Sequence, residues 1–277
     1  MLLGVMFVAS GVLKLIGIDT FEVYIYSFGL FSLPVSFILA RLCIAVEIVL
    51  GIGLMANIFN RFCVTSALCL VAFFSCFLCY AALIGRTDSC QCFGPLVEIA
   101  PTTSLVKNGI LIVLLLMVRR VRSWNWKPRW YVWLPVLIAP IVAVFCISVP
   151  DNWMFGPGEE VLNYEKLEQT IGEGGELDDA NLCEGRKLVA FFTPGCPFCK
   201  MARQKLTTLS HRFDIPAESI VWVYPVKDSV HGITSETFMG ITYGQRPEMV
   251  LLEEGKNVKS YHYRNIDEKE IADFLRP

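Results

Sequence analysis

The chain has 277 residues, of which 54% are hydrophobic and 18% are charged, and its formal net charge is -2. Nucleic-acid-binding proteins usually carry an excess of basic residues, and this chain has no such excess, so no nucleic-acid partner is expected. The length suggests two structural units. Six of the 11 cysteines fall in apolar segments, where cysteine most often serves as a small hydrophobe: Cys43, Cys63, Cys69, Cys76, Cys79 and Cys146.

The first half of the chain contains apolar runs close to the length of about 20 residues that a helix needs to cross a bilayer. They cover residues 2 to 18, 35 to 57, 62 to 84, 101 to 118 and 131 to 149. The first run lacks the basic start and the small-residue cleavage site of a signal peptide, so we expect it to stay in the membrane. The sequence therefore predicts a membrane protein with five spans.

The loops between these runs indicate how the chain crosses the membrane. The segment RRVRSWNWKPRW, residues 119 to 130, is rich in arginine and tryptophan, which is typical of a cytoplasmic loop at the membrane interface. The N-terminus is then cytoplasmic, and the loops at 19 to 34 and 85 to 100 face outward with everything after Val149. In a bacterial inner membrane this outer side is the oxidising periplasm, where disulfides persist.

Three charged residues lie within the predicted spans, where a charge is costly and marks a functional position by default. Lys14 and Arg41 fall in the outer part of their spans, and Glu47 falls near the middle of the membrane. We weigh two roles about equally for them. One is a buried ion network that locks the helices together, and the other is a site for the head group of a cofactor.

Two cysteine pairs stand out in the membrane half. RTDSCQCFGP, residues 86 to 95, places Cys90 and Cys92 in an outer loop, and strain in so short a disulfide favours exchange over a permanent crosslink. SCFLCY places Cys76 and Cys79 one helical turn apart on one face of the third span. Their spacing is similar to that of the embedded pair in quinone-linked thiol oxidases, although cysteines in helices are often inert.

The segment PDNWMFGPGEE, residues 150 to 160, is rich in Pro and Gly and is typical of a linker, and a soluble composition follows it. In this part LVAFF (188 to 192) predicts a buried strand, and CPFCKMARQKLTTL (196 to 209) predicts a helix that begins at its cysteines. Further elements are predicted as a strand at 219 to 226, a short helix at 235 to 241, a hairpin at 248 to 263 and a closing helix from Asp267 to Leu275.

This order, with the motifs FFTPGCPFCK and RPEMVLLEEGK, resembles the thioredoxin fold over most of residues 159 to 277. The unpaired amides and the dipole of a helix N-terminus stabilise a thiolate, so Cys196 is the expected nucleophile and Cys199 the resolving thiol. The resemblance implies a cis bond between Arg246 and Pro247, which would line the substrate groove. A zinc half-site or a static disulfide is the alternative for the cysteine pair.

Two departures from the thioredoxin pattern leave the direction of electron flow open. Ala190 stands where thioredoxins often have a buried carboxylate, and Pro197-Phe198 lacks the histidine found in strongly oxidising periplasmic relatives. Cys183 lies outside the Cys196–Cys199 pair, and we take it as incidental rather than catalytic.

The first half also carries motifs that together resemble the DoxX-like methylamine-utilisation MauE family, over about residues 4 to 118. They are SGVLKL at 10 to 15, ARLCIAVEIVLGIGL around Glu47, SCQCFGP at 89 to 95 and LVKNGILIVLLL at 105 to 116. The resemblance implies a four-helix membrane bundle associated with disulfide formation in exported proteins, similar in logic to the vitamin K epoxide reductase and DsbB systems. A membrane quinone, ubiquinone or menaquinone, would then accept the electrons, and the fifth span would be a tether.

The sequence as a whole predicts an α-helical membrane bundle (1–118), a basic loop with a fifth helix (119–150), a linker (151–158) and an α/β thioredoxin-like domain (159–277). We expect a quinone-linked thiol-disulfide oxidoreductase that acts on exported client proteins with cysteines, in contact with membrane lipid. The alternatives are a reductase running the opposite way, a bundle that is only an anchor, and a protein that handles Cu(I) through the same cysteines. No metal site is predicted, because no histidine has ligand spacing to a cysteine.

Overall fold

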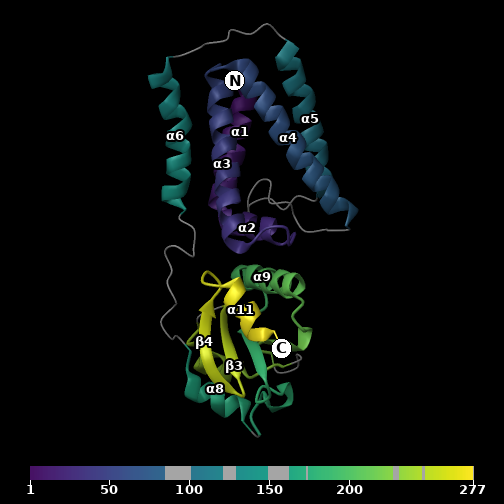
Figure 1. Ribbon diagram of the computed structural model, residues 1–277, viewed down its shortest axis with the longest axis vertical. Helices are drawn as coiled ribbons and strands as arrows, with labels where there is room; N and C mark the ends of the chain where they lie inside the picture. Colours follow the sequence, from purple (N-terminus) through teal and green to yellow (C-terminus); the bar gives the residue numbers. More distant parts are fainter. Residues whose placement is uncertain are drawn as a thin grey trace. The chain divides into compact units, whose positions relative to one another are not determined.

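The computed structural model describes residues 1–84, 101–120, 129–148, 162–172, 174–226, 231–244 and 247–276. The chain divides into two compact units, the first made of Met1–Ile25 and Val35–Val149 and the second of Tyr26–Pro34 and Pro150–Pro277. Figure 1 shows that the first unit is helical, whereas the second combines helices with a sheet.

Apolar helices make up the first unit. They are α1 (Leu2–Ile16), α2 (Ile18–Tyr26), α3 (Leu33–Met55), α4 (Asn60–Leu83), α5 (Pro101–Arg120) and α6 (Trp130–Ile147). In the described chain, three stretches are long and apolar enough to cross a membrane: Leu33–Met55, Arg61–Leu83 and Thr102–Arg120. The pair α1 and α2 passes the same test as one broken span, bent by 85°. The protein is therefore a membrane protein, while the fifth span stays a prediction because the apolar helix Tyr131–Ile147 is shorter.

The predicted loop at 19 to 34 is wrong for its first part, which forms helix α2. Ile18, Phe21 and Ile25 recur at helical spacing, and their side chains pack with those of α3 and with Val144 of α6. The segment is too short to span a membrane by itself, and the burial of its apolar stripe against the neighbouring helices stabilises it as a helix. The chain turns sharply at Gly17 to allow it.

Helices α1 and α3 pack with their backbones in close contact. A Cβ atom built on Gly4 would lie 2.6 Å from the carbonyl oxygen of Gly51, and one built on Gly51 would lie 2.9 Å from the carbonyl oxygen of Gly4. Small residues permit this approach between membrane helices. Because the two helices run so close together, polar side chains further along them can meet directly.

The second unit is built on a four-stranded mixed sheet in the order β2-β1-β3-β4. Its strands are β1 (Arg186–Phe191), β2 (Ile220–Val223), β3 (Glu248–Glu253) and β4 (Lys256–His262). β1 runs parallel to β2 and antiparallel to β3, and β3 forms a hairpin with β4. Its helices are α8 (Tyr164–Ile171), α9 (Pro197–Phe213), α10 (Ser235–Thr242) and α11 (Glu268–Leu275), with short 3₁₀ turns at Asp178–Ala180 and Ala217–Ser219.

One face of this sheet carries the main apolar core of the second unit. Val189 of β1, Val223 of β2 and Val250 of β3 pack there against Leu167 of α8 and Phe238 of α10. Helix α11 contacts both α9 and β1. The predicted elements of this half are confirmed to within a few residues, except that α8 was not predicted.

Candidate functional site

The cysteine pair of the second unit lies where β1 runs into α9. Gly195 has a φ of 76°, a left-handed conformation that glycine adopts without strain, and it turns the chain into the helix. Cys196 is the N-cap of α9, and its Sγ accepts a hydrogen bond from the amide of Cys199 at 3.3 Å. The partial positive charge of the helix N-terminus is directed toward an atom in this position.

The two cysteines differ in access. Cys196 is half-buried, whereas Cys199 is 4% exposed and lies one turn further into the helix. A groove of about 430 Å³ opens over the pair. This arrangement presents the sulfur of Cys196 to a partner in the groove and keeps that of Cys199 behind it. The division into an attacking and a resolving thiol stays a prediction, and this geometry is compatible with it.

Two charged side chains line this groove among the residues that the structure describes, and both are basic. They are Lys200 and Arg203, on the same side of α9 as the cysteines. The guanidinium carbon of Arg203 lies 5.5 Å from the ring centre of Trp222, a cation–π contact that helps to hold it in place. The groove therefore offers positive charge beside the reactive sulfur.

Ala190 is fully buried, and no carboxylate occupies its position. The sequence reasoning did not single out Glu248, which directly follows Pro247, although a carboxylate opening an otherwise apolar strand was the available signal. Glu248 is 3% exposed, and burial raises its pKa to about 7. It pairs with Phe191, so it lies on the opposite face of the sheet from Ala190 and does not replace the missing carboxylate. Arg246 lies outside the described residues.

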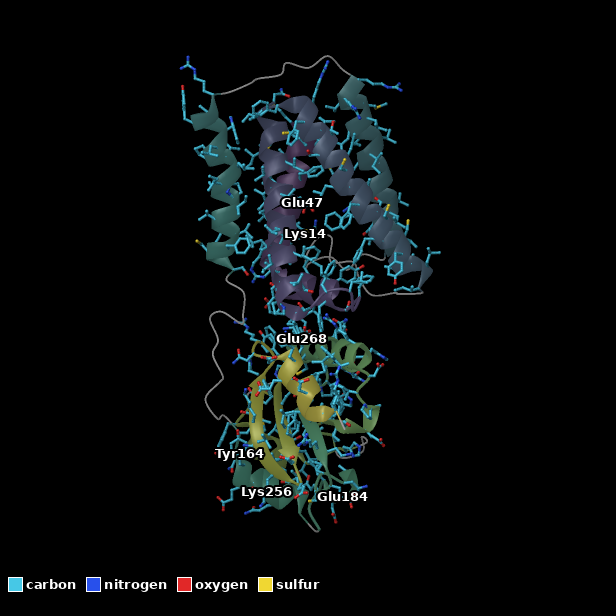
Figure 2. All side chains as sticks on the ribbon, viewed as in Figure 1. Lys14, Glu47, Tyr164, Glu184, Lys256 and Glu268 are labelled. Atoms are coloured by element: carbon cyan, nitrogen blue, oxygen red, sulfur yellow. The ribbon has the colours of Figure 1, made fainter. Side chains whose placement is uncertain are left out.

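In the first unit, Lys14 of α1 and Glu47 of α3 form a buried ion pair. Lys14 Nζ donates to Glu47 Oε2 at 2.5 Å, and the two residues are 5% and 7% exposed. Figure 2 shows them meeting inside the helical unit. Lys14 Nζ also lies 5.1 Å from the ring centre of Phe74 and 5.9 Å from that of Phe21. Two of the three predicted membrane charges are therefore direct partners.

The Lys14–Glu47 pair lines a cavity of about 70 Å³ among helices α1 to α5. Its walls are mainly apolar, with aromatic rings from α1, α2 and α4. Asn108 of α5, which is 5% exposed, also faces the cavity, and its Nδ2 donates to Ser75 Oγ of α4 at 3.2 Å. The sequence reasoning did not single out Asn108. A polar amide within an apolar run was the signal that could have found it.

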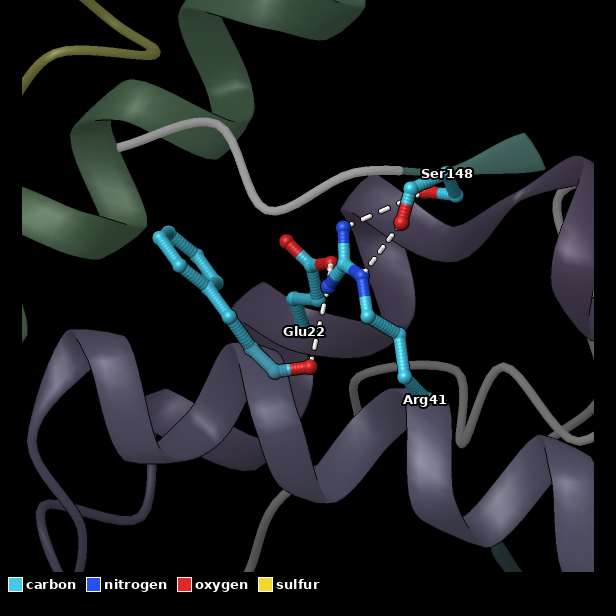
Figure 3. Close-up of polar contacts among 4 residues, drawn as sticks. Glu22, Arg41 and Ser148 are labelled. Carbon is cyan, nitrogen blue, oxygen red and sulfur yellow. Dashed lines mark hydrogen bonds and ion pairs between the residues drawn. The ribbon is translucent and has the colours of Figure 1, made fainter. Parts of the chain in front are cut away.

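Arg41 takes part in a separate network, shown in Figure 3. Its Nη1 donates to the carboxylate of Glu22 and to the carbonyl of Phe37, and its Nε and Nη2 donate to the carbonyl and hydroxyl of Ser148. Arg41 and Glu22 are 1% and 2% exposed. The network joins α2 and α3 to the residue that follows α6, and neither charged side chain lines the cavity.

Among the residues that the structure describes, no cysteine lines the cavity. Cys76 and Cys79 are exposed on α4, whereas Phe74, Phe77 and Leu78 of the same helix line the cavity. Cys90 and Cys92 lie outside the described residues. Within the part of the chain that the structure describes, no group of three or more His, Cys, Asp or Glu side chains is placed to hold a metal ion.

Comparison with known proteins bears on the first unit most directly. Residues 1–120 match the family described as methylamine utilisation protein MauE. Protein TlpB of Flavobacterium psychrophilum is 26% identical to the chain over an alignment 288 positions long, which covers 85% of this chain and 78% of that protein. No solved structure matches the chain. The predicted MauE resemblance is thereby confirmed, and the chain carries a MauE family domain at residues 1–120.

Proposed function

We propose that the protein is a membrane thiol-disulfide oxidoreductase, in which a thioredoxin-like second unit exchanges disulfides with client proteins and the MauE domain resets it. One observation carries the proposal: Cys196 caps α9, accepts the amide hydrogen of Cys199 and lies in an open groove. Thiol-disulfide exchange needs an accessible thiolate with a second thiol directly behind it.

The order of elements supports the thioredoxin-like assignment. A strand leads into the cysteine-capped helix, a parallel neighbour strand follows, and a hairpin begins directly after Pro247. A proline at this point is the residue that the resemblance associates with the substrate groove.

The proposed exchange with a client dithiol proceeds in two balanced steps. A client thiolate attacks Cys196 Sγ of the Cys196–Cys199 disulfide, and the Cys199 sulfur leaves as a thiolate and takes up a proton. The second client thiolate then attacks the client sulfur of the mixed disulfide, which releases Cys196. The client gains a disulfide, and the two electrons now reside in the Cys196–Cys199 dithiol.

The oxidised state must then be restored, and Cys90 and Cys92 are the proposed partners. Their disulfide would accept the two electrons by the same exchange chemistry. A membrane quinone is the proposed final acceptor and supplies a two-electron, two-proton sink. We place the 85 to 100 loop and the second unit on the periplasmic side of a bacterial inner membrane, because the basic segment at 119 to 130 is typical of a cytoplasmic loop.

Disulfide formation is the favoured direction over reduction. A reductase would need a cytoplasmic thiol pair to carry electrons inward, and the cysteine expected near that face is Cys63. In the structure Cys63 is buried, and its thiol donates to the carbonyl oxygen of Ile58. Burial in an apolar helix contact is typical of a structural cysteine rather than a redox-active one.

Thiol trapping in membranes tests the proposal. Cys199→Ser removes the resolving thiol, so a mixed disulfide between Cys196 and Cys90 or Cys92 should accumulate and be visible as a mass-tagged species. Cys183→Ser is the matched control, because this exposed thiol lies in the same unit outside the groove. If Cys196 is reoxidised at the wild-type rate after both Cys90 and Cys92 are replaced by Ser, the bundle is only an anchor and the relay is wrong.

A further inference from the structure

The cavity of the first unit has the size of a small ring. A single water molecule needs roughly 10–15 Å³ of such space, so about 70 Å³ holds roughly five to seven water-sized atoms. That is comparable with the six-membered ring of a benzoquinone. The rings of Phe7, Phe21, Phe74 and Phe77 stand in the wall and offer flat surfaces against which such a ring can pack.

The ion pair at this wall is costly, because both charges leave water and lie among apolar helices. Replacing such a pair by apolar side chains is often neutral or stabilising, so stability alone is a weak reason for its presence. Glu47 holds the ammonium of Lys14 in position at 2.5 Å, on the cavity side of α1. A carbonyl oxygen placed there would accept a charge-assisted hydrogen bond.

A second donor lies on another wall. The amide nitrogen of Asn108 carries two hydrogens, and the bond to Ser75 uses one of them. Ser75 is itself fixed, because its hydroxyl donates to the carbonyl of Val71 at 2.7 Å. Donors on α1 and α5 thus face one apolar space from different helices. A quinone ring presents carbonyl oxygens on opposite edges and suits this arrangement.

We infer that this cavity binds the head group of a membrane quinone, with Lys14 and Asn108 as donors to its carbonyl oxygens and Glu47 as the residue that positions Lys14. The inference rests on the proposed function and adds the site and the residues to it. Reduction of a quinone by two electrons from a dithiol takes up two protons. The dithiol releases these two protons as it is oxidised, and the Lys14 ammonium, held by Glu47, would donate a hydrogen bond to the quinone oxygen on which negative charge develops.

The test uses the full-length protein in nanodiscs free of quinone, titrated with decylubiquinone. Bound quinone is extracted and quantified, and the shift of the thermal unfolding midpoint is followed in parallel. The double variant Lys14→Met/Glu47→Leu removes the cavity pair without leaving an unpaired charge, and we expect decylubiquinone to bind roughly tenfold more weakly. Asn108→Leu should weaken binding several-fold through the loss of one neutral hydrogen bond.

The matched control is Arg41→Met/Glu22→Leu, which removes the other buried pair and leaves the cavity wall intact. It should bind decylubiquinone as the wild type does. Wild-type affinity in the Lys14/Glu47 variant, or an equal loss in both double variants, would overturn the inference. Exchange between client thiols and the Cys196–Cys199 disulfide is measured in the same samples without quinone. Its failure in the wild type counts against the proposed function, whereas intact exchange with no quinone binding counts against the cavity alone.

Discussion

The buried Glu248 makes the stability of the second unit depend on pH in a way that one substitution removes. Burial raises its pKa from an ordinary 4.5 to about 7. Each pKa unit corresponds to about 1.4 kcal/mol, so the ionised side chain costs the folded state about 3 kcal/mol relative to the unfolded one. Between pH 4.5 and 7 the folded state holds a proton that the unfolded state has released. The free energy of unfolding therefore falls as pH rises through this window and levels off above it.

Glu248→Gln keeps the shape of the protonated side chain and removes the titration. The variant should match the wild type below pH 4.5 and be more stable by up to about 3 kcal/mol above pH 7. His262, which lies opposite Glu248 on β4, contributes a slope of the other sign, because burial, with Arg264 and Lys205, lowers its pKa. Comparing variant with wild type at each pH cancels that contribution.

Hydrogen–deuterium exchange of β1 and β3 peptides in the full-length protein, corrected for intrinsic exchange at each pH, measures the effect. Glu253→Gln is the matched control, because this exposed carboxylate lies on the same strand and pairs with Arg186. It should leave the slope between pH 4.5 and 7 almost unchanged. The reasoning is refuted if the wild type and Glu248→Gln show the same pH dependence, since the buried carboxyl would then ionise without cost.

Three further predictions follow from the groove, the helix contact and the cysteine pair. Arg203→Met should lower kcat/KM roughly threefold to tenfold for client peptides with acidic residues beside the cysteine, and much less for neutral peptides or at high salt, in stopped-flow exchange assays. Gly51→Ala should destabilise the bundle by about 1–3 kcal/mol, since its Cβ would meet the α1 backbone, whereas Gly109→Ala, in open space, should not lower the thermal midpoint. With the partner cysteine replaced by Ser, Cys196 should react with maleimide roughly tenfold faster than Cys199, and equal rates would contradict the assigned roles.

The second unit was predictable because its sequence marks the ends of its elements. Pro197 stands at the first helical position of α9, and Asp267 caps α11 by accepting hydrogen bonds from two amides. The hairpin turn falls at Glu254 and Gly255, both with positive φ. Such local chemistry depends little on distant contacts, so a sequence pattern is enough to find it.

The membrane half was less predictable because its polar pairings are long-range. The sequence marked Lys14, Arg41 and Glu47 as one set of membrane charges, whereas the structure divides them between two networks. Glu22 completes the second network from a segment expected to be a solvated loop. Its burial depends on how α2 packs against α3 and α6, which no local pattern records. The cavity is harder still to foresee, since it is the space that packing leaves among five helices.

The two buried pairs share helix α3 but differ in their surroundings. Arg41 uses Nε, Nη1 and Nη2 on Glu22, Phe37 and Ser148, so its guanidinium is committed to holding three chain segments together. Lys14 instead holds its charge at the wall of an apolar space, with Glu47 on one side and an aromatic ring on another. A charge whose hydrogen bonds join three chain segments favours a structural role, and a charge at the wall of a cavity favours a ligand. Removing each pair in turn should therefore separate the two effects. Loss of the Arg41 pair should lower the unfolding midpoint without changing quinone affinity. Loss of the Lys14 pair should weaken quinone binding without lowering the unfolding midpoint.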